Sequence, residues 1–326
     1  MCLSKENFDK GLEKIQETYK IYAPVKLQYH STFSITEANR YHEVSIYDEI
    51  LIDEKSHFSP KELLSPITEK LICFKNNEVC KVFHENEKQL IFLRSCDLHG
   101  IEFLDKVLLK EGGEDETYKR KRENTKFVLI ACEESFENCF CVSAGTNRSD
   151  SYSIGMWEKG ADIYLDIKDD EFVSFFQGKL MDFEMPYVKE NLIDVTIPEK
   201  LTEDSKSLEH WRVYDEKCGA CGRCNYVCIT CGCHVFIDKF YDEHGIEGER
   251  KRMWTSCMSQ GFSECAEEQD YKALNGDRLK RKVYHKMGEE GIVNCQSICV
   301  GCGRCDDVCP RRISFSECIT KLAKYK

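Results

Sequence analysis

Two cysteine runs with the same spacing constrain this chain more than any other feature of its sequence. Both follow the pattern C-x2-C-x2-C-x3-C, and they comprise Cys218, Cys221, Cys224 and Cys228, then Cys299, Cys302, Cys305 and Cys309. Pro310 follows the second run, whereas Ile229 follows the first. Eight thiols in two short stretches predict that this part of the chain binds metal.

The spacing of the runs is typical of [4Fe-4S] clusters. Three cysteines separated by two residues wrap a loop around one cubane, and in two-cluster ferredoxins the fourth cysteine of each run binds the other cluster. The expected ligand sets therefore cross between the runs, as Cys218, Cys221, Cys224 and Cys309 for one cluster and Cys299, Cys302, Cys305 and Cys228 for the other. The alternative is structural zinc, which usually takes separated C-x2-C pairs and has no use for two such dense runs.

The overall composition supports metal binding over disulfides. The chain has 326 residues, 21 cysteines and a net charge of −12. Its N-terminus lacks the apolar stretch of a signal peptide, so we expect a reducing cytoplasmic setting. No stretch approaches the length of apolar residues that a transmembrane helix needs. The acidic balance argues against a nucleic-acid partner.

Hydrophobic patterning predicts two domains. Residues 1–198 are expected to form an α+β domain, with strands at 89–95, 126–132 and 162–167. The charged segment 199–211 is the expected linker. Strand signals are poor in residues 212–326, so a mainly helical domain is predicted there. It resembles the α-helical ferredoxin domain of iron–sulfur subunits of the succinate dehydrogenase type.

Four further cysteines are placed so that the fold could bring them together. Cys96 and Cys132 each end a predicted strand, and Cys139 and Cys141 lie in the turn that follows the second one. If these strands are neighbours, the four thiols meet at one edge of the sheet, where they would bind a third iron–sulfur cluster. The simpler alternative is that they are buried free cysteines, which pack as small apolar residues.

A second group of cysteines offers other candidate ligands for a third cluster, so the sequence does not decide which cysteines would bind it. Cys231, Cys233 and Cys257 are three candidate ligands without a clear fourth. An open iron at this group would make the chain an enzyme in its own right, but no cationic pocket for an anionic substrate is apparent in the sequence.

The chain resembles the iron–sulfur electron-transfer subunit of the dissimilatory anaerobic sulfite reductase, and it is similar to the beta subunit of cytosolic NiFe sulfhydrogenases. The resemblance is carried by RSCDLHGIEFLDKVLL, the CFC at 139–141, CGRCNYVCITCGC, the WTSC at 254–257, KVYHK and CVGCGRCDDVCP.

This resemblance implies an iron–sulfur electron-transfer subunit of an oxidoreductase complex, without a catalytic residue of its own. A flavin subunit would take hydride from NAD(P)H, this chain would relay single electrons, and a sirohaem subunit would reduce sulfite to sulfide. No G-x-G-x-x-G motif follows a predicted strand in this chain, which agrees with binding of the nucleotide by the flavin subunit. The alternative partner is a NiFe hydrogenase, and a structural zinc adaptor is the rival of a different class.

Overall fold

The computed structural model describes residues 1–30, 35–76, 78–81, 87–111, 113–198, 209–264, 273–287, 292–293 and 296–324. Most of the expected linker, residues 199–208, lies outside the described residues, as do Cys265 and Cys295. The end of the expected linker belongs to a 3-10 turn, η4 (Glu209–Arg212).

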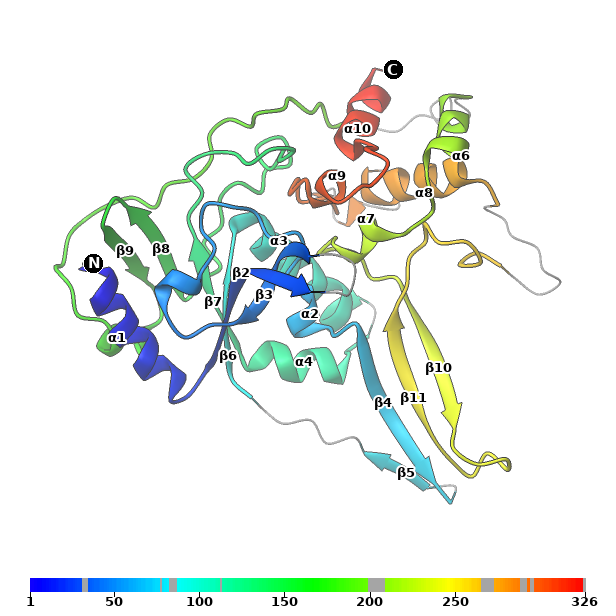
Figure 1. Ribbon diagram of the computed structural model, residues 1–326, viewed down its shortest axis with the longest axis horizontal. Coiled ribbons are helices and arrows are strands. Elements are labelled where there is room, and N and C mark those ends of the chain that lie inside the picture. Colours follow the sequence, from blue (N-terminus) through cyan, green and yellow to red (C-terminus); the bar gives the residue numbers. More distant parts are fainter. Residues whose placement is uncertain are drawn as a thin grey trace.

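A seven-stranded mixed sheet forms the body of the N-terminal part (Figure 1). Its strand order is β1-β9-β8-β7-β6-β2-β3; β2, β6, β7 and β8 are parallel neighbours, and the outer pairs are antiparallel. The strands are β1 (Cys2–Ser4), β2 (Lys20–His30), β3 (Ile35–Glu43), β6 (Gln89–Leu93), β7 (Thr125–Ile130), β8 (Ile154–Lys159) and β9 (Asp162–Ile167). The strands expected at 89–95, 126–132 and 162–167 are thus confirmed as β6, β7 and β9.

Helices cover both faces of this sheet. Leu90 and Phe92 of β6 belong to the core that includes α1 (Lys5–Gln16), whereas the alternate residues Ile91 and Leu93 belong to the core that includes α3 (Ser95–Lys106). Central parallel strands buried on both sides read as continuous apolar runs, which explains the sequence QLIFL. The remaining helices of this part are η1 (Tyr47–Glu49), α2 (Lys61–Leu64), η2 (Val107–Glu111), α4 (Glu116–Glu123) and η3 (Asp170–Phe175).

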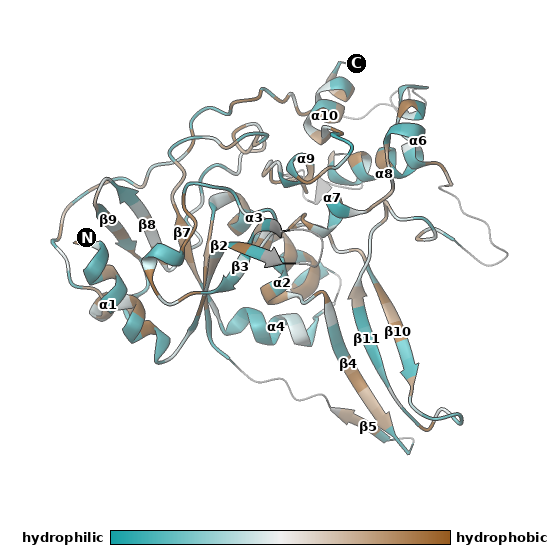
Figure 2. Ribbon diagram, viewed as in Figure 1, coloured by the Kyte–Doolittle hydropathy of each residue, from teal (hydrophilic) through white to brown (hydrophobic). Residues whose placement is uncertain are grey.

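A second sheet joins segments that are far apart in the sequence. Its order is β10-β11-β4-β5, and its strands are β4 (Thr68–Lys75), β5 (Glu78–Lys81), β10 (His234–Phe240) and β11 (Glu247–Trp254). Met253 lies opposite Thr68 and Glu247 lies opposite Lys75, so β11 pairs with β4 along most of its length. In Figure 1 this sheet projects away from the body. Figure 2 contrasts the hydrophobic stretch of β4 with the hydrophilic helix α4.

The hairpin of β10 and β11 corrects the prediction of a mainly helical C-terminal domain. The sequence of this hairpin gives a weak strand signal because charged residues occupy many positions of β11, where a half-buried strand would alternate apolar and polar residues. Arg250 and Asp238 are direct cross-strand partners, and the guanidinium donates two hydrogen bonds of 2.6 and 2.7 Å to the carboxylate. Such opposite-charge pairs stabilise a ladder as apolar pairs do.

Helices surround the cysteine runs in the rest of the C-terminal part. They are α6 (Val213–Lys217), α7 (Arg223–Tyr226), α8 (Asn275–Met287), α9 (Arg304–Asp307) and α10 (Phe315–Ala323), with two short strands, β12 (Ile292–Val293) and β13 (Gln296–Ser297). Trp211, Val283 and Ile319 are fully buried between them. In the part of the chain that the structure describes, no helix has the length and apolar character needed to cross a bilayer. The predicted cytoplasmic location stays a prediction.

Candidate iron–sulfur centres

The two cysteine runs adopt the same local fold. A glycine with left-handed backbone, Gly222 (φ 72°) or Gly303 (φ 68°), directly precedes a one-turn helix, α7 or α9. The third cysteine of each run, Cys224 or Cys305, is the second residue of that helix. Glycine adopts this backbone conformation without strain, so the repeated G-R-C pattern fixes how each loop turns into its helix. The helices α7 and α9 pack against each other.

Thiols of the first run lie beside the last thiol of the second run. Burial raises the pKa of Cys218, and the neighbouring thiols of Cys221 and Cys309 raise it further. Burial also raises the pKa of Cys224, where Cys218 and Cys309 add to the shift. All four members of the expected first set, Cys218, Cys221, Cys224 and Cys309, line one cavity.

The second run has the converse arrangement. Burial raises the pKa of Cys299 to about 12, and the thiols of Cys228 and Cys302 contribute to this rise. Burial likewise raises the pKa of Cys302, with Cys228 again among the causes. Burial also raises the pKa of Cys305 well above its usual value, and the thiols of Cys299 and Cys302 add to this rise. The chain therefore brings together the members of each crossed set, while the ligand assignment itself stays a prediction.

The surroundings of these thiols suit the anionic sulfurs of a cluster. The backbone N–H of Ala220 donates to Cys218 Sγ at 3.4 Å, and that of Ile313 donates to Cys309 Sγ at 3.3 Å. Hydrogen bonds to cluster sulfurs help to set the reduction potential. Thiolate donors with amide N–H groups aimed at them fit the chemistry of an iron–sulfur cluster.

Buried lysines accompany the runs, and sequence reasoning missed them. Lys282 of α8 is 3% exposed and donates to the carbonyl of Cys224 at 3.3 Å. Burial alone would lower its pKa, but the thiols of Cys224, Cys305 and Cys228 outweigh burial and raise it. Lys282 thus lies beside thiols of both sets. In the sequence, only the position of Lys282 within KRKVYHK, beside the apolar Val283 of a predicted helix, could have indicated that this lysine is buried.

The four N-terminal cysteines also come together. Because β6 and β7 are parallel neighbours, with Leu93 opposite Leu129, their carboxyl ends meet at one edge of the sheet. One cavity of about 240 Å³ at this edge is lined by all four thiols, those of Cys96, Cys132, Cys139 and Cys141, called here the N-terminal thiol group. Cys139 and Cys141 are buried.

Cys231, Cys233 and Cys257 form a separate row of thiols. The Cys233 thiol hydrogen-bonds the thiols of both other cysteines, and this contact with Cys233 lowers the pKa of Cys257 to about 6. Asn225 Nδ2 also donates to Cys257 Sγ at 3.1 Å. The row borders a cavity of about 410 Å³ together with Lys61, Lys282 and Lys286. No fourth cysteine borders this cavity among the described residues.

The spacing of these side chains does not suit a single ion. Within the described ranges, no group of three or more His, Cys, Asp or Glu side chains could hold one metal ion. A zinc site needs its ligands to converge on one point, whereas the thiolates of a cubane bind different irons. The cysteines in the described part of the chain are free thiols.

Comparison with known proteins agrees with this chemistry. The family model described as a 4Fe-4S dicluster domain matches residues 217–313. The cofactors of this region are therefore two [4Fe-4S] clusters. No solved structure matches the chain.

A relative covers almost the whole chain. The beta subunit of sulfhydrogenase 2 from Pyrococcus furiosus is 30% identical over 346 aligned positions, which cover 98% of this chain and 97% of the relative. This finding supports the alternative, a hydrogenase beta subunit, better than the expected sulfite reductase subunit. This chain belongs to the family of the sulfhydrogenase beta subunits.

Proposed function

We propose that this chain is the electron-transfer beta subunit of a NiFe hydrogenase complex of the sulfhydrogenase type. The observation that carries the proposal is the near full-length similarity to a sulfhydrogenase beta subunit. In addition, the last cysteine of each run lies beside the first cysteines of the other run. We assign Cys218, Cys221, Cys224 and Cys309 to one cluster and Cys299, Cys302, Cys305 and Cys228 to the other. Each cluster, when bound, accepts and releases one electron.

The residues around the runs support a relay rather than a catalytic site. Lys282 is buried beside thiols of both sets, where its charge offsets the negative charge that two neighbouring clusters bring. Lys286 is also buried and donates to Thr230, which in turn contacts Cys228 Sγ. These cations favour the more negative, reduced form of each site, so they raise the tendency to accept an electron.

The proposed partners follow from this role. A hydrogenase subunit with a NiFe site would release electrons from H2, and a flavin subunit would exchange them with NAD(P)H. This chain would bind neither H2 nor the nucleotide, and it would supply the cysteines that hold the relay between them.

Anaerobic affinity purification of the tagged, full-length chain from its native host tests the proposal. A nickel-containing hydrogenase subunit and a flavoprotein are expected to copurify in fixed ratio, with H2-dependent reduction of a nicotinamide cofactor. Copurification with a sirohaem subunit, and no H2-dependent activity, would refute the hydrogenase assignment while leaving an electron-transfer role intact.

A further inference from the structure

The N-terminal thiol group has the donors that an iron–sulfur cluster needs around its sulfurs. Arg94 Nη1 donates to Cys132 Sγ at 3.1 Å, Lys55 Nζ donates to Cys139 Sγ at 3.5 Å, and Asn191 Nδ2 donates to Cys141 Sγ at 3.5 Å. Three of the four thiols thus receive a hydrogen bond from a side chain of another segment. Cysteines that merely fill a core do not need such donors.

Arg94 supplies an independent observation. Its side chain is 6% exposed, and its guanidinium bonds the carbonyls of Ile52 and Glu54 and the sulfur of Cys132. Within the part of the chain that the structure describes, no carboxylate pairs with it. A buried cation without an anionic partner is costly, because desolvation is not offset by a counter-charge. An anionic cluster in the adjoining cavity would supply that charge.

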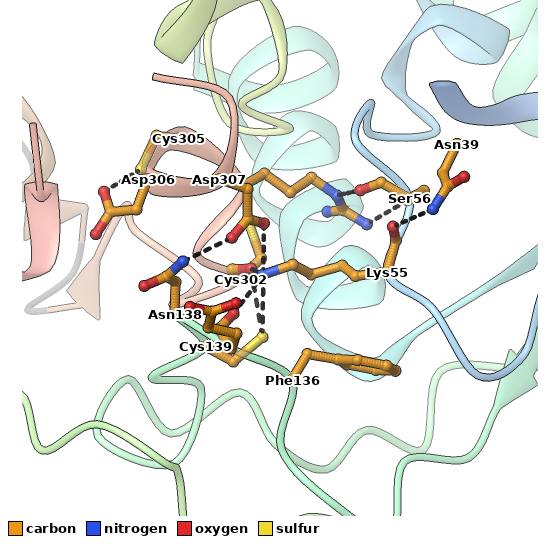
Figure 3. A network of polar contacts seen from close by, with 12 residues as sticks. Asn39, Lys55, Ser56, Phe136, Asn138, Cys139, Cys302, Cys305, Asp306 and Asp307 are labelled. Carbon is orange, nitrogen blue, oxygen red and sulfur yellow. Dashed lines mark hydrogen bonds and ion pairs between the residues drawn. The ribbon is translucent and has the colours of Figure 1, made fainter. Parts of the chain in front are cut away.

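The thiol group is also joined directly to the second cysteine run. Cys139 Sγ donates to the carbonyl of Cys302 at 3.4 Å. Lys55 Nζ donates to the same carbonyl at 3.0 Å and forms an ion pair of 2.7 Å with Asp307 (Figure 3). Figure 3 shows the Lys55 ammonium between Cys139 and Asp307, so one lysine connects the N-terminal thiol group with the second run.

Backbone packing holds the two loops in this position. Phe140 N donates to the carbonyl of Gly301 at 2.7 Å, and Thr146 Oγ1 donates to that of Val300 at 2.7 Å. A Cβ atom at Gly303 would lie 2.2 Å from the carbonyl oxygen of Asn138. The second run therefore rests on the loop that carries Cys139, at van der Waals distance.

We propose that the N-terminal thiol group binds a third [4Fe-4S] cluster, which exchanges electrons with the cluster held by the second run. Binding replaces the four thiol protons with bonds to iron. In each transfer one electron leaves one cluster and enters the other, so one is oxidised as the other is reduced and no proton is required. The inference rests on the proposed electron-transfer function and extends it. The chain would hold three clusters, one of which lies in its N-terminal part.

The test is the iron and acid-labile sulfide content of the anaerobically purified, full-length chain. About twelve irons per chain are expected, from three cubanes of four. Cys132→Ala should lower the count to about eight, while the EPR signals of the two remaining clusters after dithionite reduction persist. Cys73→Ala is the matched control, since Cys73 is also a half-buried free thiol, and it should keep about twelve. Cys141→Ala repeats the test if the first variant does not fold.

Two results would overturn the inference. A wild-type chain with about eight irons would leave no third cluster. A count of about twelve that survives Cys132→Ala and Cys141→Ala, but falls in Cys257→Ala, would move the third cluster to the other thiol row. None of these counts depends on the partner subunits. A failure to copurify with a hydrogenase would therefore refute the proposed function and leave this inference standing.

Discussion

Arg304 and Asp97 form an ion pair in which the side chains are only 1% and 0% exposed. The guanidinium donates two hydrogen bonds of 2.5 and 2.9 Å to the carboxylate, and it also bonds Ser56. Arg304 lies within the second cysteine run, between Cys302 and Cys305, and Asp97 follows Cys96 in α3. The pair therefore fixes the second run against the N-terminal part of the chain. The residue at the N-terminal cap of α3 is Arg94, so Asp97 lies in the first turn of this helix and does not cap it.

Removing Asp97 should destabilise the protein strongly. Asp97→Ala leaves the Arg304 charge buried without its partner, which typically costs about 3–5 kcal/mol. The midpoint of anaerobic guanidinium unfolding, followed by circular dichroism, measures the effect. Arg223 takes the matching position in the first run and is exposed, so Arg223→Ala should change stability by less than about 0.5 kcal/mol. Equal effects of the two variants would contradict this account.

Close packing of the second run on the loop that carries Asn138 predicts a difference between two glycines. Gly303 and Gly145 both have a φ of 68°, but a Cβ at Gly303 meets the Asn138 carbonyl, whereas nothing lies within 4 Å at Gly145. Alanine at either position carries the left-handed backbone cost of about 1–2 kcal/mol. Gly303→Ala should lose roughly 1–3 kcal/mol more through overpacking. Unfolding midpoints that fall equally in the two variants would rule out the close contact.

Lys282 should raise the reduction potentials of both clusters of the dicluster domain. Lys282→Met removes a buried positive charge that favours the reduced, more negative form. We expect both potentials to fall by on the order of 60 mV, which corresponds to about 1.4 kcal/mol for one electron. An EPR-monitored redox titration measures the shift. Lys321→Met on the exposed side of α10 is the control, and a shift confined to one cluster would place Lys282 beside that cluster alone.

The His99–Glu102 pair predicts a pH dependence of stability. His99 Nδ1 lies 3.3 Å from Glu102, and this hydrogen bond raises the pKa of His99 above its usual value. The protonated imidazole is therefore favoured in the folded state. Its contribution is complete below about pH 6.5, the unfolded value, and is lost as the pH rises through the folded pKa. The loss should be less than about 1 kcal/mol, because the pair is partly exposed to solvent.

Unfolding midpoints at pH 6 and pH 8 measure this dependence. The wild type should be less stable at the higher pH, and His99→Gln should remove most of the difference. A variant that keeps the full difference would show that another group is responsible.

The iron–sulfur centres were largely predictable from the sequence because most of their proposed ligands lie close together along the chain, at a characteristic spacing. The spacing from Cys218 to Cys228 and from Cys299 to Cys309 repeats closely enough to predict two clusters. The convergence of Cys96 with Cys132 followed from strand ends, and the parallel pairing of β6 with β7 bears out that reasoning about the sheet edge.

The charged residues inside the fold could not be predicted in the same way. Lys61, Lys282 and Arg304 are buried, yet lysine and arginine in polar stretches indicate exposed helix faces. Their burial depends on thiols and carboxylates supplied by distant segments. The pairing of β4 with β11 was missed for a related reason, since local patterns do not report contacts between strands so far apart in sequence.

The most direct measurement of the central claim is the EPR spectrum of the purified, oxidised complex before and after exposure to H2 without added mediator. We predict that H2 reduces the [4Fe-4S] clusters of this chain, and that Cys309→Ala, which removes a proposed ligand of one cluster, abolishes one of the signals. Clusters that stay oxidised under H2 in a complex with an active hydrogenase site, yet are reduced by dithionite, would contradict the assignment of this chain as the electron-transfer subunit of a hydrogenase.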